Sequence, residues 1–156
     1  MSENPADEIV PGLWLGSRAA ALDPRWIGEH NIKCVFNCTK DFPYVETVQR
    51  RYRVPIDDNL QFEEIRNLEL WSFEVVYKMV REYQTGEQIL VHCAAGRQRS
   101  AACVALFLIA TRNMNPQQAM EFIKSKRPVA FFPSPNFLKA IESFYSSYQK
   151  VITPKI

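Results

Sequence analysis

A cysteine and an arginine separated by five residues carry the most evident chemistry in this 156-residue sequence. Cys93 follows a short apolar run at 89–91, and Arg99 is followed by Ser100 and an apolar stretch. A thiolate is a strong nucleophile, and a planar guanidinium can hold two oxygens of one phosphate group. The spacing therefore predicts attack by the Cys93 sulfur on a phosphorus atom that Arg99 holds in place.

This pair depends on the backbone that carries it. The run at 89–91 predicts a buried strand, and the residues after Arg99 predict a helix, so Cys93 lies on a strand-to-helix loop. A helix N-terminus carries unpaired N–H groups and a positive dipole end, which suits a phosphate-like anion. A cysteine in that field is expected to be a thiolate at neutral pH. The Gly-Lys-Ser/Thr sequence of a Walker-type loop is absent.

The pattern His92-Cys93-x5-Arg99-Ser100 resembles the signature of the protein tyrosine phosphatase superfamily, and the surrounding motifs resemble its dual-specificity branch. The resemblance spans 9–148. Its other motifs are similar to I-x-x-x-L-Y-L-G at 9–16, V-L-N-V-T at 35–39 and I-P-V-x-D at 54–58. It implies a phosphatase that hydrolyses phosphotyrosine and phosphoserine or phosphothreonine through a cysteinyl-phosphate.

The loop after the cysteine is expected to bind the substrate phosphate. Its backbone amides and the Arg99 guanidinium would hold the equatorial oxygens, where charge gathers in the transition state. Gly96 is expected to adopt a conformation, or to allow a close approach, that a side chain would block. The expected substrate-binding residues are Ala94, Ala95, Gly96, Arg97, Gln98 and Arg99.

The same resemblance implies roles for two neighbours of the nucleophile, Ser100 and His92. Ser100 would donate its hydroxyl to the Cys93 sulfur, which stabilises the thiolate as a leaving group; a simple helix cap is the alternative. His92 would orient the loop through hydrogen bonds rather than shuttle protons. Together with Arg99, these residues complete the expected catalytic set on this loop.

The leaving group needs a proton, and the resemblance assigns the general acid to the 54–58 segment. Asp58 is the match to the family's acid, and Asp57 is its competitor. The same carboxylate would then activate water to hydrolyse the intermediate. Because a neutral acid and a thiolate must coexist, the rate is expected to follow a bell-shaped pH profile that peaks below neutral pH.

The order of predicted elements indicates one α/β domain, with a central, mostly parallel sheet flanked by helices, as in cysteine-dependent phosphatases. Residues 101–109 are apolar on all sides and predict a central, covered helix. The expected division is a flexible lead-in at 1–7, the dual-specificity phosphatase catalytic domain at 8–150, and a tail at 151–156.

The four cysteines, Cys34, Cys38, Cys93 and Cys103, include no C-x-x-C pair, which favours a reducing, intracellular and cytoplasmic setting. All but Cys93 are interpreted as small buried residues. His30, Cys34 and Cys38 would be metal ligands only if one strand exposed them together, and no fourth ligand is evident. No metal or cofactor is therefore expected.

The expected partners are phosphorylated proteins. A net charge of +2 implies no nucleic acid, no apolar run suggests a membrane segment, and a monomer is the default. The alternatives are the same chemistry on a phospholipid or an RNA 5′-triphosphate, and a phosphate-binding module without turnover. Arg97 is either an extra cation at the pocket rim or a solvated residue. The arginines of 50–53 either steer anions or form a solvated strand.

Overall fold

The computed structural model describes residues 3–152 and contains a five-stranded sheet. The strands, in their order across the sheet, are β1 (Ala6–Val10), β2 (Leu13–Gly16), β5 (Gln88–His92), β3 (Ile32–Asn37) and β4 (Arg50–Arg53). Only the β1–β2 pair is antiparallel; β2–β5, β5–β3 and β3–β4 are parallel. The central strand β5 is therefore the one that leads into Cys93.

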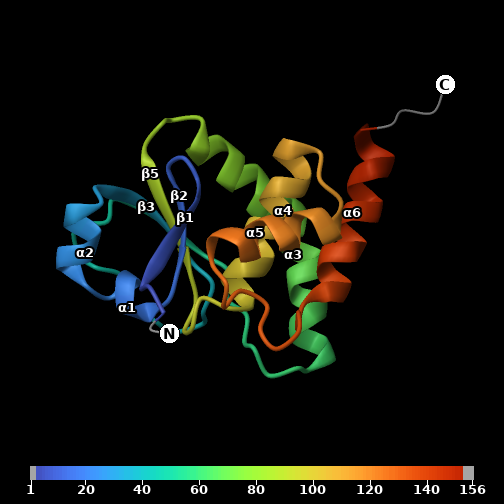
Figure 1. The fold of residues 1–156 in the computed structure, drawn as a ribbon, viewed down its shortest axis with the longest axis horizontal. Helices are drawn as coiled ribbons and strands as arrows, with labels where there is room; N and C mark the ends of the chain where they lie inside the picture. Colours follow the sequence, from blue (N-terminus) through green and yellow to red (C-terminus); the bar gives the residue numbers. More distant parts are fainter. Residues whose placement is uncertain (1–2, 153–156) are drawn as a thin grey trace.

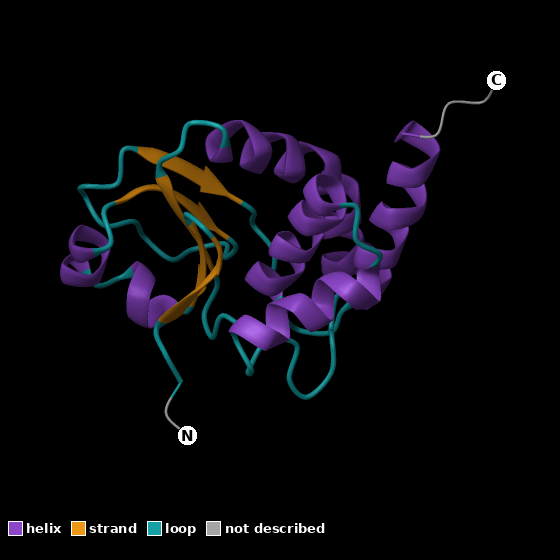
Figure 2. Cartoon of the chain, turned by 45° about the horizontal axis from the view of Figure 1, so that its top comes forward, coloured by secondary structure: helices purple, strands orange, loops and turns teal. Residues whose placement is uncertain are grey.

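Helices cover both faces of the sheet, as Figures 1 and 2 show. One face carries α1 (Arg18–Ala21) and α2 (Pro24–Glu29). The other face carries α3 (Phe62–Tyr83), α4 (Arg99–Arg112), α5 (Pro116–Lys126) and α6 (Leu138–Ile152). This arrangement confirms the predicted α/β fold with a mostly parallel central sheet.

The core lies on both sides of β5, because successive side chains of a strand point to opposite faces. Ile89 and Val91 belong to the apolar cluster under α3–α6, whereas Leu90 belongs to the cluster under α1 and α2. Helix α4 is buried from Ser100 to Ile109, as its apolar sequence predicts. The strand-to-helix loop that carries Cys93 is thus anchored in the core.

Side-chain hydrogen bonds cap the first turns of α1, α2 and α5. The side chains of Ser17 and Asp23 accept hydrogen bonds from the backbone at the starts of α1 and α2. Asn115 and Gln118 form a reciprocal capping box at the start of α5. Each such cap satisfies a backbone donor that the helix itself leaves unpaired.

The structure corrects both predicted ends. Ala6 and Asp7, expected within a flexible lead-in at 1–7, belong to β1, because Ala6 is buried and the Asp7 carboxylate accepts a hydrogen bond from Arg127. The tail predicted at 151–156 is helical over its first two residues, since α6 extends to Ile152. Residues 1–2 and 153–156 of these two predictions lie outside the described residues.

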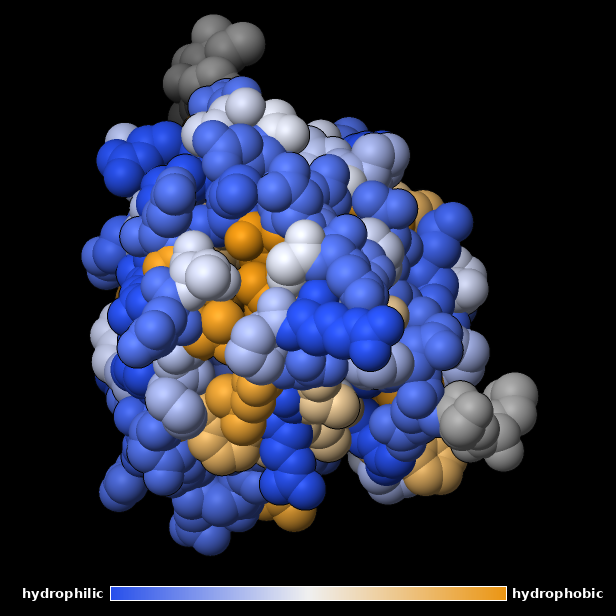
Figure 3. Space-filling model, turned by 90° about the vertical axis from the view of Figure 1, so that its left-hand side faces the viewer, coloured by the Kyte–Doolittle hydropathy of each residue, from blue (hydrophilic) through white to orange (hydrophobic). Residues whose placement is uncertain are grey.

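The face formed around α1 and α2 is mostly hydrophilic, with a few apolar side chains exposed between polar ones (Figure 3). Within 3–152, none of the helices has both the length and the apolar character that a membrane span requires.

Candidate functional site

The loop that joins β5 to α4, residues 93–99, is here termed the phosphate loop. Cys93 is 2% exposed at the start of this loop, and its Sγ lies 3.1 Å from the Oγ of Ser100 in the first turn of α4. Ser100 is itself fully buried. The predicted pairing of hydroxyl and sulfur is therefore present in the structure.

The backbone carbonyls of residues 94–97 in the phosphate loop each accept a hydrogen bond from outside the loop. The donors are Arg18 N to Ala94 O, Arg127 Nη2 to Ala95 O, Arg127 Nε to Gly96 O, and Phe131 N to Arg97 O. By contrast, in the part of the chain that the structure describes, no backbone amide from 94 to 99 donates to a protein acceptor. These amides therefore remain available as donors to a bound anion.

Arg127 is the residue that sequence reasoning missed. It ends α5, is 1% exposed, and donates from Nη1 to Asp7 Oδ2 at 2.8 Å and to Asn4 O at 2.9 Å. Its contacts to the carbonyls of Ala95 and Gly96 measure 3.3 and 2.9 Å. In the sequence it is one of three cations in a basic helix exit, and only its position before Pro128 sets it apart.

Gly96 meets the expectation made for it in both respects. Its φ is +66°, in the left-handed region, and a Cβ at this position would lie 2.6 Å from the backbone of Gly16. The phosphate loop therefore packs directly on the end of β2, with no room for a side chain.

Arg99 and Asp58 line one cavity together with Cys93. The cavity has a volume of about 340 Å³, and its lining residues are Asp58, Cys93, Ala94, Ala95, Arg97, Gln98, Arg99, Phe132, Pro133 and Asn136. Arg99 Nη1 donates to the Ile56 carbonyl at 3.1 Å, which ties the phosphate loop to the 54–61 segment. Asn136 Nδ2 donates to Asp58 Oδ1 at 2.8 Å.

Asp57, the competing acid, is held elsewhere. Its carboxylate pairs with Lys40 Nζ at 3.2 Å, and its amide donates to Glu64 Oε2 at 2.6 Å. Glu64 in turn pairs with Lys40 at 2.9 Å. Asp57 therefore belongs to an ion cluster with Lys40 and Glu64, whereas Asp58 lines the cavity that contains the Cys93 sulfur.

His92 is fully buried at the end of β5, and its Nδ1 donates to the Cys93 carbonyl at 3.3 Å. Burial lowers the pKa of His92 to about 4, against the opposing effect of that hydrogen bond; the charges of Arg53 and Arg99 lower it further. The imidazole is thus neutral through the physiological range. Within residues 3–152, the one hydrogen bond of its ring is with the loop backbone, which is consistent with the expected orienting role.

Two expected substrate-binding side chains are engaged with the protein instead. Gln98 Nε2 donates to the carbonyls of Phe132 and Ser134, and its Oε1 accepts from Asn136 N at 2.9 Å. These bonds hold the backbone that precedes α6, which begins at Leu138. Gln98 can face a substrate phosphate only through its backbone amide.

Arg97 lines the cavity but forms an ion pair with Glu3. The arginines of β4 are also occupied. Arg50 pairs with Glu82 at 2.7 Å and with Glu87 at 3.2 Å, while Arg51 and Arg53 donate to backbone carbonyls of the preceding loop. The solvated or structural interpretation of these cations therefore fits better than anion steering.

The remaining cysteines are buried and free, as predicted. Burial raises the pKa of Cys34 to about 12. Cys38 Sγ lies 3.7 Å from Cys103 Sγ, and this hydrogen bond together with burial raises the pKa of Cys38.

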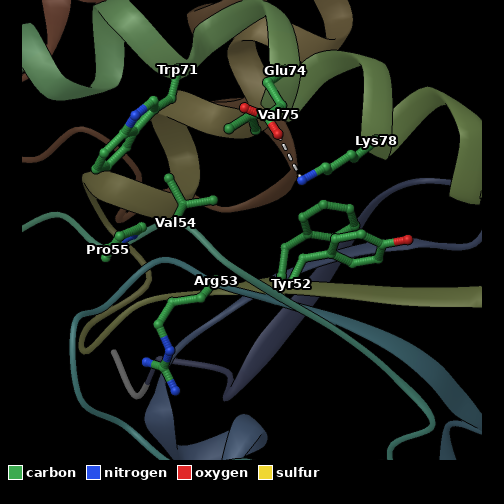
Figure 4. A pocket seen from close by; sticks show the side chains of 9 residues that line it. Tyr52, Arg53, Val54, Pro55, Trp71, Glu74, Val75 and Lys78 are labelled. Carbon is green, nitrogen blue, oxygen red and sulfur yellow. Dashed lines mark ion pairs between the residues drawn. The ribbon is translucent and has the colours of Figure 1, made fainter.

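A second, smaller hollow of about 150 Å³ lies between α3 and the β4 edge (Figure 4). Trp71 and Val75 reach it from α3, Val54 and Pro55 from the other side, and a Glu74–Lys78 ion pair of 2.9 Å crosses its rim. It contains neither cysteine nor histidine, so it offers no counterpart to the chemistry of the first cavity.

Known proteins resemble this chain in sequence and in fold. Residues 13–147 match the family model described as dual specificity phosphatase, catalytic domain. The chain is 29% identical to Dual specificity protein phosphatase 1 of Arabidopsis thaliana, covering 94% of this chain and 72% of the relative. It is 31% identical to Dual specificity protein phosphatase 2 of Homo sapiens, covering 83% of this chain but only 40% of that protein. The crystal structure of human DUSP28 superposes with a TM-score of 0.80 at 27% identity, covering 95% of this chain and 97% of that one.

Proposed function

The chain belongs to the dual-specificity phosphatases, a family of phosphoric monoester hydrolases, and we propose that it dephosphorylates proteins through a cysteinyl-phosphate intermediate. Its substrates are phosphotyrosine and phosphoserine or phosphothreonine side chains. The observation that carries this proposal is the single cavity in which the Cys93 thiol, the Arg99 guanidinium and the Asp58 carboxyl meet.

The first step transfers the phosphoryl group to sulfur. The Cys93 thiolate attacks phosphorus, the S–P bond forms, and the P–O bond to the side chain breaks. The free amides of 94–99 and Arg99 hold the three equatorial oxygens, where charge accumulates. Asp58 supplies the proton that the departing oxygen takes.

The second step releases phosphate. Asp58, now a carboxylate, takes a proton from water as the water oxygen bonds to phosphorus. The S–P bond breaks and its electron pair returns to Cys93, where the Ser100 hydroxyl stabilises the thiolate at 3.1 Å. His92 orients the loop and moves no proton, because its low pKa keeps it neutral.

Charged lipids and RNA ends are less well supported as substrates. A polyanionic head group needs free cations around the phosphate pocket, and here Arg97 pairs with Glu3 while Arg127 is buried beneath the loop. The cavity lining also includes Phe132 and Pro133, which are apolar.

Removal of the nucleophile tests the proposal. Cys93→Ser is expected to lose at least ~10⁴-fold in turnover of phosphopeptides and aryl phosphates while the protein stays folded. Cys103→Ala, which removes a buried thiol outside the cavity, is the matched control and should keep its activity. A substrate panel with phosphoinositides, phosphatidylglycerophosphate and triphosphate-ended RNA completes the test. Full activity of Cys93→Ser would contradict the mechanism, and faster turnover of a lipid or RNA would contradict the substrate class.

A further inference from the structure

One wall of the cavity is an aromatic side chain that the fold leaves in water. Phe132 lines the cavity with Cys93 and Asp58 and is 62% exposed. An exposed phenyl ring forgoes most of the stabilisation that its burial would give, so packing does not account for this position. Other exposed aromatic side chains of the chain, such as Tyr77 on α3, do not line this cavity.

The backbone fixes Phe132 at this position. Phe131 has a φ of +64°, in the left-handed region, and its own ring is buried with 1% exposure. The Phe131 amide donates to Arg97 O at 2.7 Å, and Gln98 Nε2 donates to Phe132 O at 3.2 Å. A non-glycine residue in this region is strained unless its surroundings hold it. The phosphate loop itself therefore holds the turn that carries Phe132.

The rest of the cavity rim leaves room for a flat ring beside it. Ala94 and Ala95 are the smallest side chains that the loop can carry apart from glycine, and Pro133 extends the apolar surface. The one additional cation of the rim, Arg97, is paired with Glu3. The surface around the reacting groups thus complements an uncharged aromatic leaving group better than a second phosphate.

We propose that Phe132 is the specificity-determining residue of this site and gives it a preference for phosphotyrosine over phosphoserine and phosphothreonine. This inference rests on the proposed phosphatase function. The Phe132 ring would contact the phenyl ring of phosphotyrosine, whereas the short aliphatic side chains of phosphoserine and phosphothreonine carry no ring to reach it. Because this contact is the same in the bound substrate and in the transition state, it lowers KM and leaves kcat little changed.

The test compares phosphotyrosine and phosphothreonine in peptides of otherwise identical sequence. In Phe132→Ala, the ratio of kcat/KM for phosphotyrosine to kcat/KM for phosphothreonine is expected to fall by roughly three- to tenfold, the usual strength of one aromatic pair. The fall should arise from a higher KM for phosphotyrosine. Phe132→Tyr, which keeps an aromatic ring, should have the ratio of the unsubstituted protein. Tyr77→Ala, which removes an exposed aromatic ring from α3, should also leave the ratio unchanged.

The outcomes separate this inference from the function on which it rests. If the unsubstituted protein hydrolyses both peptides and Phe132→Ala leaves the ratio unchanged, the specificity role is wrong and the phosphatase function stands. A change of kcat alone, equal for both peptides, would likewise overturn it, because it would indicate a disturbed phosphate loop. If the unsubstituted protein hydrolyses neither peptide, both the proposed function and this inference are contradicted.

Discussion

The phosphate loop, which carries Cys93, is held by buried groups, whereas residues 57–61, which include Asp58, are partly or fully exposed. Arg127 and Gly16 hold the loop from below, and both contacts lie in the interior. The 54–61 segment has no regular structure. Its start is anchored by the buried side chains of Val54 and Ile56 and by the bond from Arg99 to the Ile56 carbonyl. Its acidic part is held by Lys40 and Glu64 at Asp57 and by Asn136 at Asp58.

This difference in burial suits the different roles of the nucleophile and the general acid. A nucleophile and its anion cradle must not reorganise during the reaction, so a rigid, buried frame favours catalysis. A general acid must approach different leaving groups and must exchange its proton with solvent, which the exposed position of Asp58 permits. Changes to the first region should therefore cost stability and rate together, and changes to the second should cost mainly rate.

The largest effect is expected at Arg127. Arg127→Met leaves Asp7 and the carbonyls of Ala95 and Gly96 without their donor, and breaking such a buried pair costs about 3–5 kcal/mol. Chemical denaturation should show this loss in the free energy of unfolding. Lys124→Met removes the same charge from the exposed side of α5 and should change stability little. Equal stability of the two variants would contradict the buried frame.

Substitution of Asp58 should reduce the rate strongly and the stability little. Asp58→Asn is expected to lose about 10²-fold in kcat on phosphothreonine, less on an activated aryl phosphate, and little stability. The fall in rate on the alkaline side of the pH profile should disappear, because that limb reports loss of the acid proton. Asp57→Asn should lose no more than about fivefold. A larger loss for Asp57→Asn would reassign the acid.

The pH dependence of the unfolding free energy tests the burial of His92 beside the phosphate loop. The unfolded chain binds a proton near pH 6.5, but folded His92 does so only near 4, so protonation favours unfolding between these values. Its contribution to stability is complete above pH 6.5 and falls by about 2 kcal/mol between pH 7 and pH 5. His92→Asn should flatten the pH dependence of the unfolding free energy by this amount. An unchanged slope would contradict a neutral, buried imidazole.

The smallest effect is expected at Lys40. Lys40→Met removes both ion pairs behind the 54–61 segment and should lower kcat on phosphothreonine by roughly two- to fivefold through poorer positioning of Asp58. Because these pairs are partly exposed, high salt should bring the unsubstituted protein close to the variant. The control is Lys33→Met, which changes a lysine that forms no ion pair with any residue of 3–152. If the difference in kcat between Lys40→Met and the unsubstituted protein is the same at high salt, the ion pairs of Lys40 do not position Asp58.

The sequence was sufficient for the fold and for the phosphate loop, because both depend on local patterns. The apolar run of β5, the apolar helix α4 and the spacing from Cys93 to Arg99 are continuous in the chain. The tertiary attachments could not be predicted in this way. Arg127 reaches Asp7 across 120 positions, and Asn136 reaches Asp58 across 78, and neither distance leaves a local signal.

The choice between Asp57 and Asp58 shows the same limit of sequence patterns. The two residues are adjacent and chemically identical, so only the resemblance ranked them. Their environments differ because Lys40 and Glu64 hold Asp57, which leaves Asp58 to line the cavity. Likewise, Arg97 differs from a free rim cation only because Glu3, 94 positions earlier, pairs with it.

Direct observation of the phosphorylated enzyme tests the central claim. Asp58→Asn, which should hydrolyse the intermediate slowly, is mixed with an activated aryl phosphate, quenched rapidly and examined by intact-protein and peptide mass spectrometry. We expect one added phosphoryl group on the peptide that contains Cys93, and none when Cys93→Ser is combined with Asp58→Asn. Phosphate released without any labelled Cys93 peptide, or label on another residue, would contradict it.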